Sequence, residues 1–116
     1  MNQDARRAPR RNVQEPVPVT DTMTDQSLGR LGNLSETGML LISDAALRED
    51  ALYQLRFQIR DAQGRAQGEP VDVGAQVLWC GQANTPGQTW AGLRFLTISE
   101  PHRLQLRAWV AADTPK

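Results

Sequence analysis

Two stretches in the second half of the chain alternate between apolar and polar residues with a period of two. In residues 53–60 every second side chain is apolar, and glutamine or arginine stands between. In residues 71–79 the same alternation runs through Val71, Val73, Ala75, Val77 and Trp79. A period of two predicts strands with one face buried and one facing water. A chain organised around two such strands is constrained to fold as a sheet.

Four further segments have shorter patterns of the same kind. We expect strands at residues 17–23, 28–33, 39–42 and 90–95, the third of them a continuous apolar run that is typical of a buried strand. Residues 28–33 contain two glycines, which permit a bulge or the close approach of another group.

The periodicity changes near the end of the chain. Ser99 is a suitable helix N-cap, and Glu100 and Pro101 are favourable in a first turn. Residues 100–112 therefore predict a helix whose buried face includes Leu106 and Trp109. Six short strands and one helix favour an antiparallel barrel or sandwich. We expect a flexible arm at residues 1–16, the β-structure at 17–98, and the helix and tail at 99–116.

Composition narrows the function classes. The chain has 116 residues and 13 basic against 13 acidic residues, a balance that argues against a general nucleic-acid binder. Its single cysteine excludes an intramolecular disulfide and a thiolate metal cluster. There is no secretory h-region and no apolar run of about 18 residues, so we expect a cytoplasmic protein without a transmembrane segment.

Candidates for catalysis are few. His102 is the only histidine and falls in the first turn of the expected helix, where a surface position is the simplest interpretation. Cys80 follows an apolar strand, and the carboxylates show no paired spacing. We therefore expect that the protein is not an enzyme, and that it has no catalytic residue, no bound metal and no cofactor.

The opening arm concentrates positive charge. Four arginines stand within six residues: Arg6, Arg7, Arg10 and Arg11. A guanidinium presents a planar fork of donors that suits phosphate oxygens and the O6/N7 edge of guanine. Taken alone, such an arm is more often a solvated tail, a weak anion or RNA contact, or a docking segment for a partner.

A second polar element is the segment Asn33-Leu34-Ser35-Glu36-Thr37-Gly38, which predicts a tight turn between two strands. The Asn and Ser side chains can bond nearby backbone N–H groups, and Gly38 can adopt a positive φ.

These two elements, in this order and spacing, resemble the signature of the PilZ domain family, an RxxxR pair followed by (D/N)xSxxG. The pair can be Arg6/Arg10 or Arg7/Arg11. Residues 77–80 and 91–95 are also similar to the last two strands of such domains. The resemblance covers nearly the whole chain. It implies a six-stranded antiparallel β-barrel with a C-terminal helix, acting as a bacterial receptor for the second messenger cyclic di-GMP.

The resemblance also implies roles for single residues. The four arginines would hold phosphates and guanine edges, and Asn33 would offer its amide to a guanine. Ser35 would donate to the ligand or brace the turn, and Gly38 would shape the backbone beside the ligand. Trp79 either stacks on a guanine or packs in the core, since it continues the apolar face of residues 71–77.

Two functions follow as hypotheses. The first is a stand-alone cyclic di-GMP receptor whose arm is loose without ligand, becomes ordered on binding and alters contacts with an unidentified protein partner, in signalling linked to motility or biofilm. The alternative is a PilZ-fold interaction module of pilus or motility machinery, with ligand binding secondary or absent. We expect a monomer or weak homodimer and no DNA or RNA partner; RNA binding through the arm is a third possibility and predicts steep salt dependence.

Overall fold

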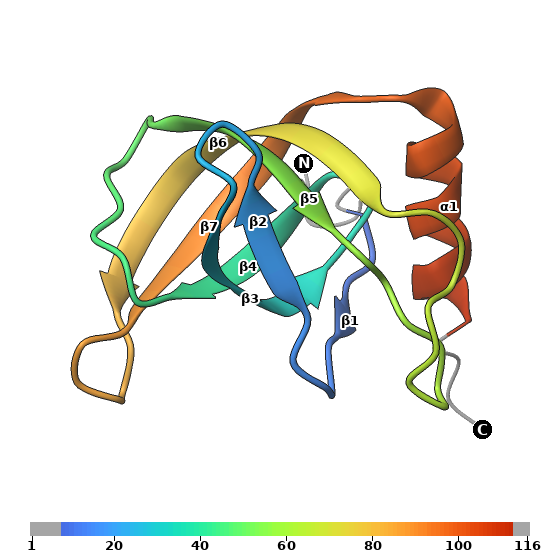
Figure 1. The fold of residues 1–116 in the computed structure, drawn as a ribbon, viewed down its shortest axis with the longest axis horizontal. Helices are drawn as coiled ribbons and strands as arrows, with labels where there is room; N and C mark the ends of the chain where they lie inside the picture. The colour runs from blue at the N-terminus through green and yellow to red at the C-terminus, as the bar shows by residue number, and fades with distance from the viewer. Residues whose placement is uncertain (1–7, 113–116) are drawn as a thin grey trace, which may run out of the picture.

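The computed structural model describes residues 8–112, and its sheet closes into a barrel (Figure 1). The described elements are β1 (Arg11–Asn12), β2 (Pro18–Asp21), β3 (Gln26–Leu34), β4 (Gly38–Ser43), β5 (Leu52–Phe57), β6 (Val71–Gln82), β7 (Thr89–Ile98) and α1 (Glu100–Ala111). The strand order is β1-β3-β2-β5-β6-β7-β4, and an additional β3–β4 pairing closes the ring. The predicted six-stranded antiparallel barrel with a C-terminal helix is confirmed.

Strand β1 is the one described strand that the sequence analysis did not predict. It lies within the segment assigned to the arm, and it pairs with β3 through Arg11 opposite Leu34 and Asn12 opposite Asn33. Two residues are too few to show a period of two, so only pairing with a neighbouring strand reveals them.

The core follows the alternation of the long strands. Every second residue from Val71 to Val77 is at most 2% exposed, and so are the inward residues Leu55 and Phe57 of β5. They meet Leu41 of β4 and other apolar side chains in one continuous core. The barrel interior is therefore filled by side chains, and any binding site must lie outside it.

Two register shifts redirect side chains on β3 and β6. Leu31 pairs with Leu41 but Asn33 pairs with Leu40, so Gly32 is an extra residue in β3. Leu78 is likewise extra in β6, because Val77 pairs with Leu93 but Trp79 with Gly92.

Each bulge moves the following residue to the opposite face of the sheet. Asn33 and Trp79 therefore point away from the core, and Trp79 is 46% exposed. Its interpretation as a core residue is wrong, since the apolar face of residues 71–77 ends at this bulge.

Helix α1 lies against one end of the barrel (Figure 1). Ser99 caps it by accepting a hydrogen bond from the backbone N–H of His102, as predicted. Leu106 and Trp109 are buried, and the Trp109 indole donates to the carbonyl oxygen of Arg60 at 2.8 Å. No helix among residues 8–112 combines the length and the apolar character needed to cross a bilayer.

Candidate functional site

One row of residues crosses four neighbouring strands on the outside of the barrel. Asn33 pairs with Leu40, Leu40 with Gly92, and Gly92 with Trp79. Neighbouring strands lie about 4.8 Å apart, so the row spans roughly 14 Å from its amide end to its indole end. Without the two bulges, Asn33 and Trp79 would face the core, and this row would have neither its polar end nor its aromatic end.

A shallow hollow of about 340 Å³ lies over this row. Its lining residues come from β3, β4, β6, β7 and the segment before β1: Arg10, Asn33, Met39, Leu40, Trp79, Trp90 and Gly92. At its polar end Nη1 of Arg10 donates to Oδ1 of Asn33 at 2.8 Å. The hollow thus combines a guanidinium and an amide at one end with flat apolar surface at the other.

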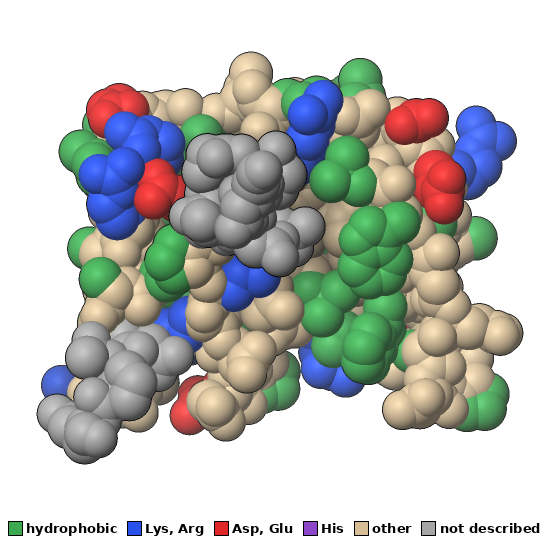
Figure 2. All heavy atoms as spheres, turned by 180° about the vertical axis from the view of Figure 1, so that it is seen from behind, with side chains coloured by type: hydrophobic (Ala, Val, Ile, Leu, Met, Phe, Trp, Pro, Cys, Tyr) green, Lys and Arg blue, Asp and Glu red, His purple; other side chains and the backbone are tan. Residues whose placement is uncertain are grey.

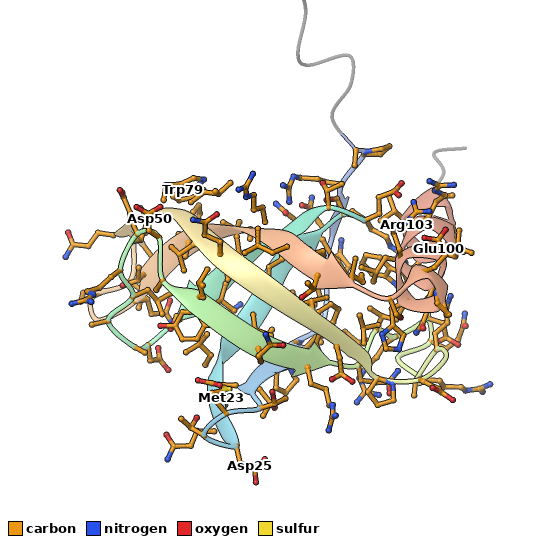
Figure 3. All side chains as sticks on the ribbon, turned by 90° about the horizontal axis from the view of Figure 1, so that it is seen from above. Met23, Asp25, Asp50, Trp79, Glu100 and Arg103 are labelled. Carbon is orange, nitrogen blue, oxygen red and sulfur yellow. The ribbon has the colours of Figure 1, made fainter. Side chains whose placement is uncertain are left out.

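The apolar part of the hollow depends on two glycines. A Cβ on Gly92 would lie 2.2 Å from Nε1 of Trp79, so the indole lies flat across the Gly92 backbone. A Cβ on Gly32 would lie 3.0 Å from Cδ2 of Leu40. Figure 2 shows hydrophobic side chains gathered on this face of the molecule, and Figure 3 shows Trp79 on the outside of the barrel. The result is a low apolar shelf suited to a flat ligand group.

The turn that follows Asn33 is braced from within. Ser35 is fully buried, and its hydroxyl accepts hydrogen bonds from the backbone N–H groups of Thr37 and Gly38, each at 3.1 Å. Of the two roles considered for Ser35, bracing the turn is therefore the one with contacts in the structure. It holds the backbone between Asn33 and β4 in one shape.

Gly38 does not use the positive φ expected from its position in the turn. Positive values occur at Gly29, Gly64, Gly68 and Gly87 among the described glycines. Gly38 instead pairs with Arg94 in β7, and a Cβ there would lie 2.4 Å from the carbonyl oxygen of Leu93. The requirement for glycine comes from close packing between β4 and β7.

Arg11 points away from the hollow. Its guanidinium carbon lies 4.2 Å from the centroid of the Trp109 ring, and Nη1 donates to the Trp109 carbonyl oxygen at 2.7 Å. Successive side chains on a strand project to opposite faces, so Arg10 and Arg11 reach different parts of the molecule. Arg6 and Arg7 lie outside the described residues.

Glu36, inside the turn, faces α1. Its carboxylate accepts from Nη1 of Arg103 at 2.8 Å and from Nε of Arg107 at 3.1 Å (Figure 3 labels Arg103 with its other partner, Glu100). The Glu36 side chain is only 18% exposed. Hydrogen bonds from Arg107 and Arg103 hold its pKa below the usual glutamate value. The turn is therefore tied to the helix by charge.

Sequence analysis identified the polar end of the hollow and missed most of its apolar part. Trp90, Met39, Leu40 and Gly92 were not among the predicted site residues. Exposed tryptophans are unusual on a small domain, yet nothing in the local pattern distinguishes Trp90 from a packing residue. Within the described residues no cluster of three or more His, Cys, Asp or Glu is arranged to hold a metal ion.

Comparison with protein families agrees with this geometry. The model of the PilZ domain matches residues 4–112. The chain belongs to the PilZ domain family. No curated protein sequence matches this PilZ domain.

Solved structures share the fold. The inhibitor of motility MotI/DgrA from Bacillus subtilis superposes with a TM-score of 0.73 at 11% identity, covering 97% of this PilZ domain and 51% of that chain. YcgR from Escherichia coli in complex with c-di-GMP superposes with a TM-score of 0.70 at 24% identity, covering 91% of this PilZ domain and 44% of that chain. The PilZ domain of YcgR with c-di-GMP superposes with a TM-score of 0.64 at 20% identity, covering 90% of this PilZ domain and 88% of that chain. This chain thus spans about half the length of the MotI chain and of the YcgR chain in the first of the two complexes.

Proposed function

We propose that this PilZ domain is a receptor for cyclic di-GMP. The ligand would bind in the hollow, between Arg10 and the apolar surface that contains Trp79. The observation that supports it most directly is the 2.8 Å bond between Arg10 and Asn33, which unites the two signature elements across 23 positions of sequence. The YcgR structures that share this fold hold c-di-GMP. Membership of the family and the chemistry of the hollow point to the same ligand.

Each end of the hollow suits one part of such a dinucleotide. A guanidinium binds phosphate oxygens or the O6/N7 edge of guanine through two parallel hydrogen bonds. The Asn33 amide carries N–H donors beside the Oδ1 atom that Arg10 binds, so it can donate to a guanine acceptor. Trp79 offers its exposed ring for stacking, which contributes about 1–3 kcal/mol per base.

The position of Arg10 bears on the choice of arginine pair. The signature pairs arginines that stand four residues apart in the sequence, so Arg6 belongs with Arg10, and Arg7 with Arg11. Because Arg10 lines the hollow and Arg11 lies over Trp109, we assign the ligand pair to Arg6/Arg10. Arg7 and Arg11 would then affect binding less, through charge or through the seating of the arm.

The effect of ligand binding on a protein partner would be transmitted through α1. Arg11 from the arm and Glu36 from the turn both hold this helix, and each is adjacent to a residue of a signature element, Arg10 and Ser35. A ligand held by Arg10 would strengthen the pairing of β1 with β3 and so favour the Arg11–Trp109 contact. The proposed output is a changed presentation of α1 to a cytoplasmic protein partner, by a monomer or weak dimer.

Calorimetric titration with cyclic di-GMP tests the receptor function. We expect micromolar or tighter binding by the wild type and a loss of at least about tenfold in Arg10→Ala and Asn33→Ala, since each removes a charge-assisted or amide contact. Arg65→Ala is the matched control, because Arg65 is an exposed arginine in the β5–β6 connection and does not line the hollow.

Two results would overturn the proposal. An absence of binding by the wild type would leave the interaction-module hypothesis, in which this fold works without the ligand. Binding of unrelated oligonucleotides with a steep dependence on salt would instead indicate a nucleic-acid contact through the arm.

A further inference from the structure

A second exposed tryptophan stands on β7. Trp90 is 40% exposed and lines the same hollow as Arg10, Asn33 and Trp79. Within the described part of the chain, the Trp79 and Trp90 indole N–H groups donate no hydrogen bond, whereas that of Trp109 donates to Arg60. Trp109 is thus a packing residue with a satisfied donor, whereas Trp79 and Trp90 are partly exposed to the solvent.

The register of the barrel places the two exposed tryptophans beside each other. A second outward row runs Arg30–Ile42–Trp90–Gly81, next to the row that ends in Trp79. Trp79 is opposite Gly92, and Trp90 is two residues from Gly92 on the same face of β7. Such diagonal neighbours across two strands lie about 7–8 Å apart at their backbones, within reach of aromatic rings.

The glycines opposite the two rings differ. The Trp79 ring already occupies the space above Gly92, whereas a Cβ added to Gly81 would meet nothing within 4 Å. Trp90 therefore does not cover its cross-strand partner, and the backbone at Gly81 is open beside it. A glycine in a strand interior with open space above it is a position where a ligand can approach the sheet closely.

We propose that Trp90 is a further ligand-contacting residue, whose ring stacks on a base of the bound dinucleotide alongside Trp79. The inference rests on the proposed function. The ligand has two guanines, and the hollow has two exposed indole rings at the end away from Arg10. An aromatic side chain of this kind binds any base through its π-face, so Trp90 adds affinity while Arg10 and Asn33 supply the selectivity for guanine.

Calorimetry on tryptophan variants gives the first test. Replacing a stacking ring raises the Kd for cyclic di-GMP by about tenfold, so we expect this in Trp90→Leu, and a smaller change in Trp90→Phe, which keeps an aromatic face. Leu52→Ala is the control, because Leu52 is an exposed leucine of β5 that does not line the hollow. A Kd for Trp90→Leu equal to that of the wild type overturns the inference and leaves the receptor function standing.

Fluorescence separates stacking from a structural effect. In Trp79→Phe the remaining tryptophans are Trp90 and Trp109, and we expect cyclic di-GMP to quench the emission. In the double variant Trp79→Phe/Trp90→Phe the quenching should be clearly smaller, because only Trp109, which lies beside Arg11, is left to respond. Quenching that is unchanged in the double variant, or absent already in Trp79→Phe while calorimetry still detects binding, would show that Trp90 does not stack. If the wild type does not bind at all, the proposed function fails first.

Discussion

Arg11 covers the indole of Trp109, 4.2 Å from the ring centroid, and caps the last turn of α1 by donating to the Trp109 carbonyl oxygen. The helix has no basic residue of its own in that turn. A cation near a helix C-terminus is favourable because it complements the negative end of the helix dipole. The preceding residue, Arg10, meets Asn33 on the other side of the strand, so two consecutive arginines connect the hollow and the helix.

Replacing Arg11 by methionine keeps an apolar stem over Trp109 and removes the charge. We expect a loss of about 1 kcal/mol of unfolding free energy, the usual size of a cation–π contact at a partly exposed site. Denaturant unfolding measures it. Binding of cyclic di-GMP should weaken less in Arg11→Met than in Arg10→Met. Equal losses of affinity in both variants would indicate diffuse electrostatics and contradict a defined role for each arginine.

Glu36→Gln should weaken the attachment of the turn to α1. Because folding lowers the pKa of Glu36, its ion pairs stabilise the fold fully above the pKa of the unfolded chain, and this stabilisation is lost as the pH falls through the folded-state pKa. We therefore expect the melting temperature of Glu36→Gln to be a few degrees below that of the wild type at neutral pH.

The same comparison at lower pH distinguishes the cause. The two melting temperatures should converge only at a pH below the usual range of a glutamate pKa, because the pKa of folded Glu36 is lowered and its carboxyl group is protonated only there. Glu49→Gln, an exposed change in the β4–β5 connection, should match the wild type throughout. A difference between Glu36→Gln and the wild type that persists unchanged in acid would show that packing, rather than charge, holds the turn against the helix.

Gly38→Ala tests the close approach of β4 and β7. The added methyl group would sit 2.4 Å from the Leu93 carbonyl oxygen, so the strands must move apart. Overpacking of this kind costs about 1–3 kcal/mol of unfolding free energy. Gly81→Ala is the matched strand variant, with open space above it, and should be close to neutral. Equal unfolding free energies of the two variants would show that β7 can move away from β4 without loss of stability.

Ser35→Ala removes the acceptor of two backbone N–H groups inside the turn. Leaving the buried Gly38 N–H group without a partner costs about 1–3 kcal/mol, which chemical denaturation resolves. Ser27→Ala serves as the comparison, since Ser27 is exposed and its hydroxyl makes a long hydrogen bond of 3.5 Å to the Gly29 carbonyl oxygen. If Ser35→Ala keeps full stability but binds cyclic di-GMP more weakly, the hydroxyl acts on the ligand directly.

Much of the fold could be read from local patterns. The period of two in residues 53–60 and 71–77 predicts strands because alternate side chains of a strand face opposite sides. Ser99 and Pro101 mark the start of α1 because they satisfy or avoid its unpaired N–H groups. The polar end of the hollow could also be predicted, since Arg10 and Asn33 belong to two elements with a recognisable spacing.

Local patterns thus predict six of the seven described strands, the helix and the polar chemistry of the site. The tertiary structure decided which side chains meet. Bulges at Gly32 and Leu78 turn Asn33 and Trp79 outward, and barrel closure brings them into one row with Leu40 and Gly92. A bulge reverses the facing of every later residue, and its position depends on the partner strand as well as on the strand that contains it. For the same reason, only the pairing of β1 with β3 directs Arg10 to the hollow and Arg11 to Trp109.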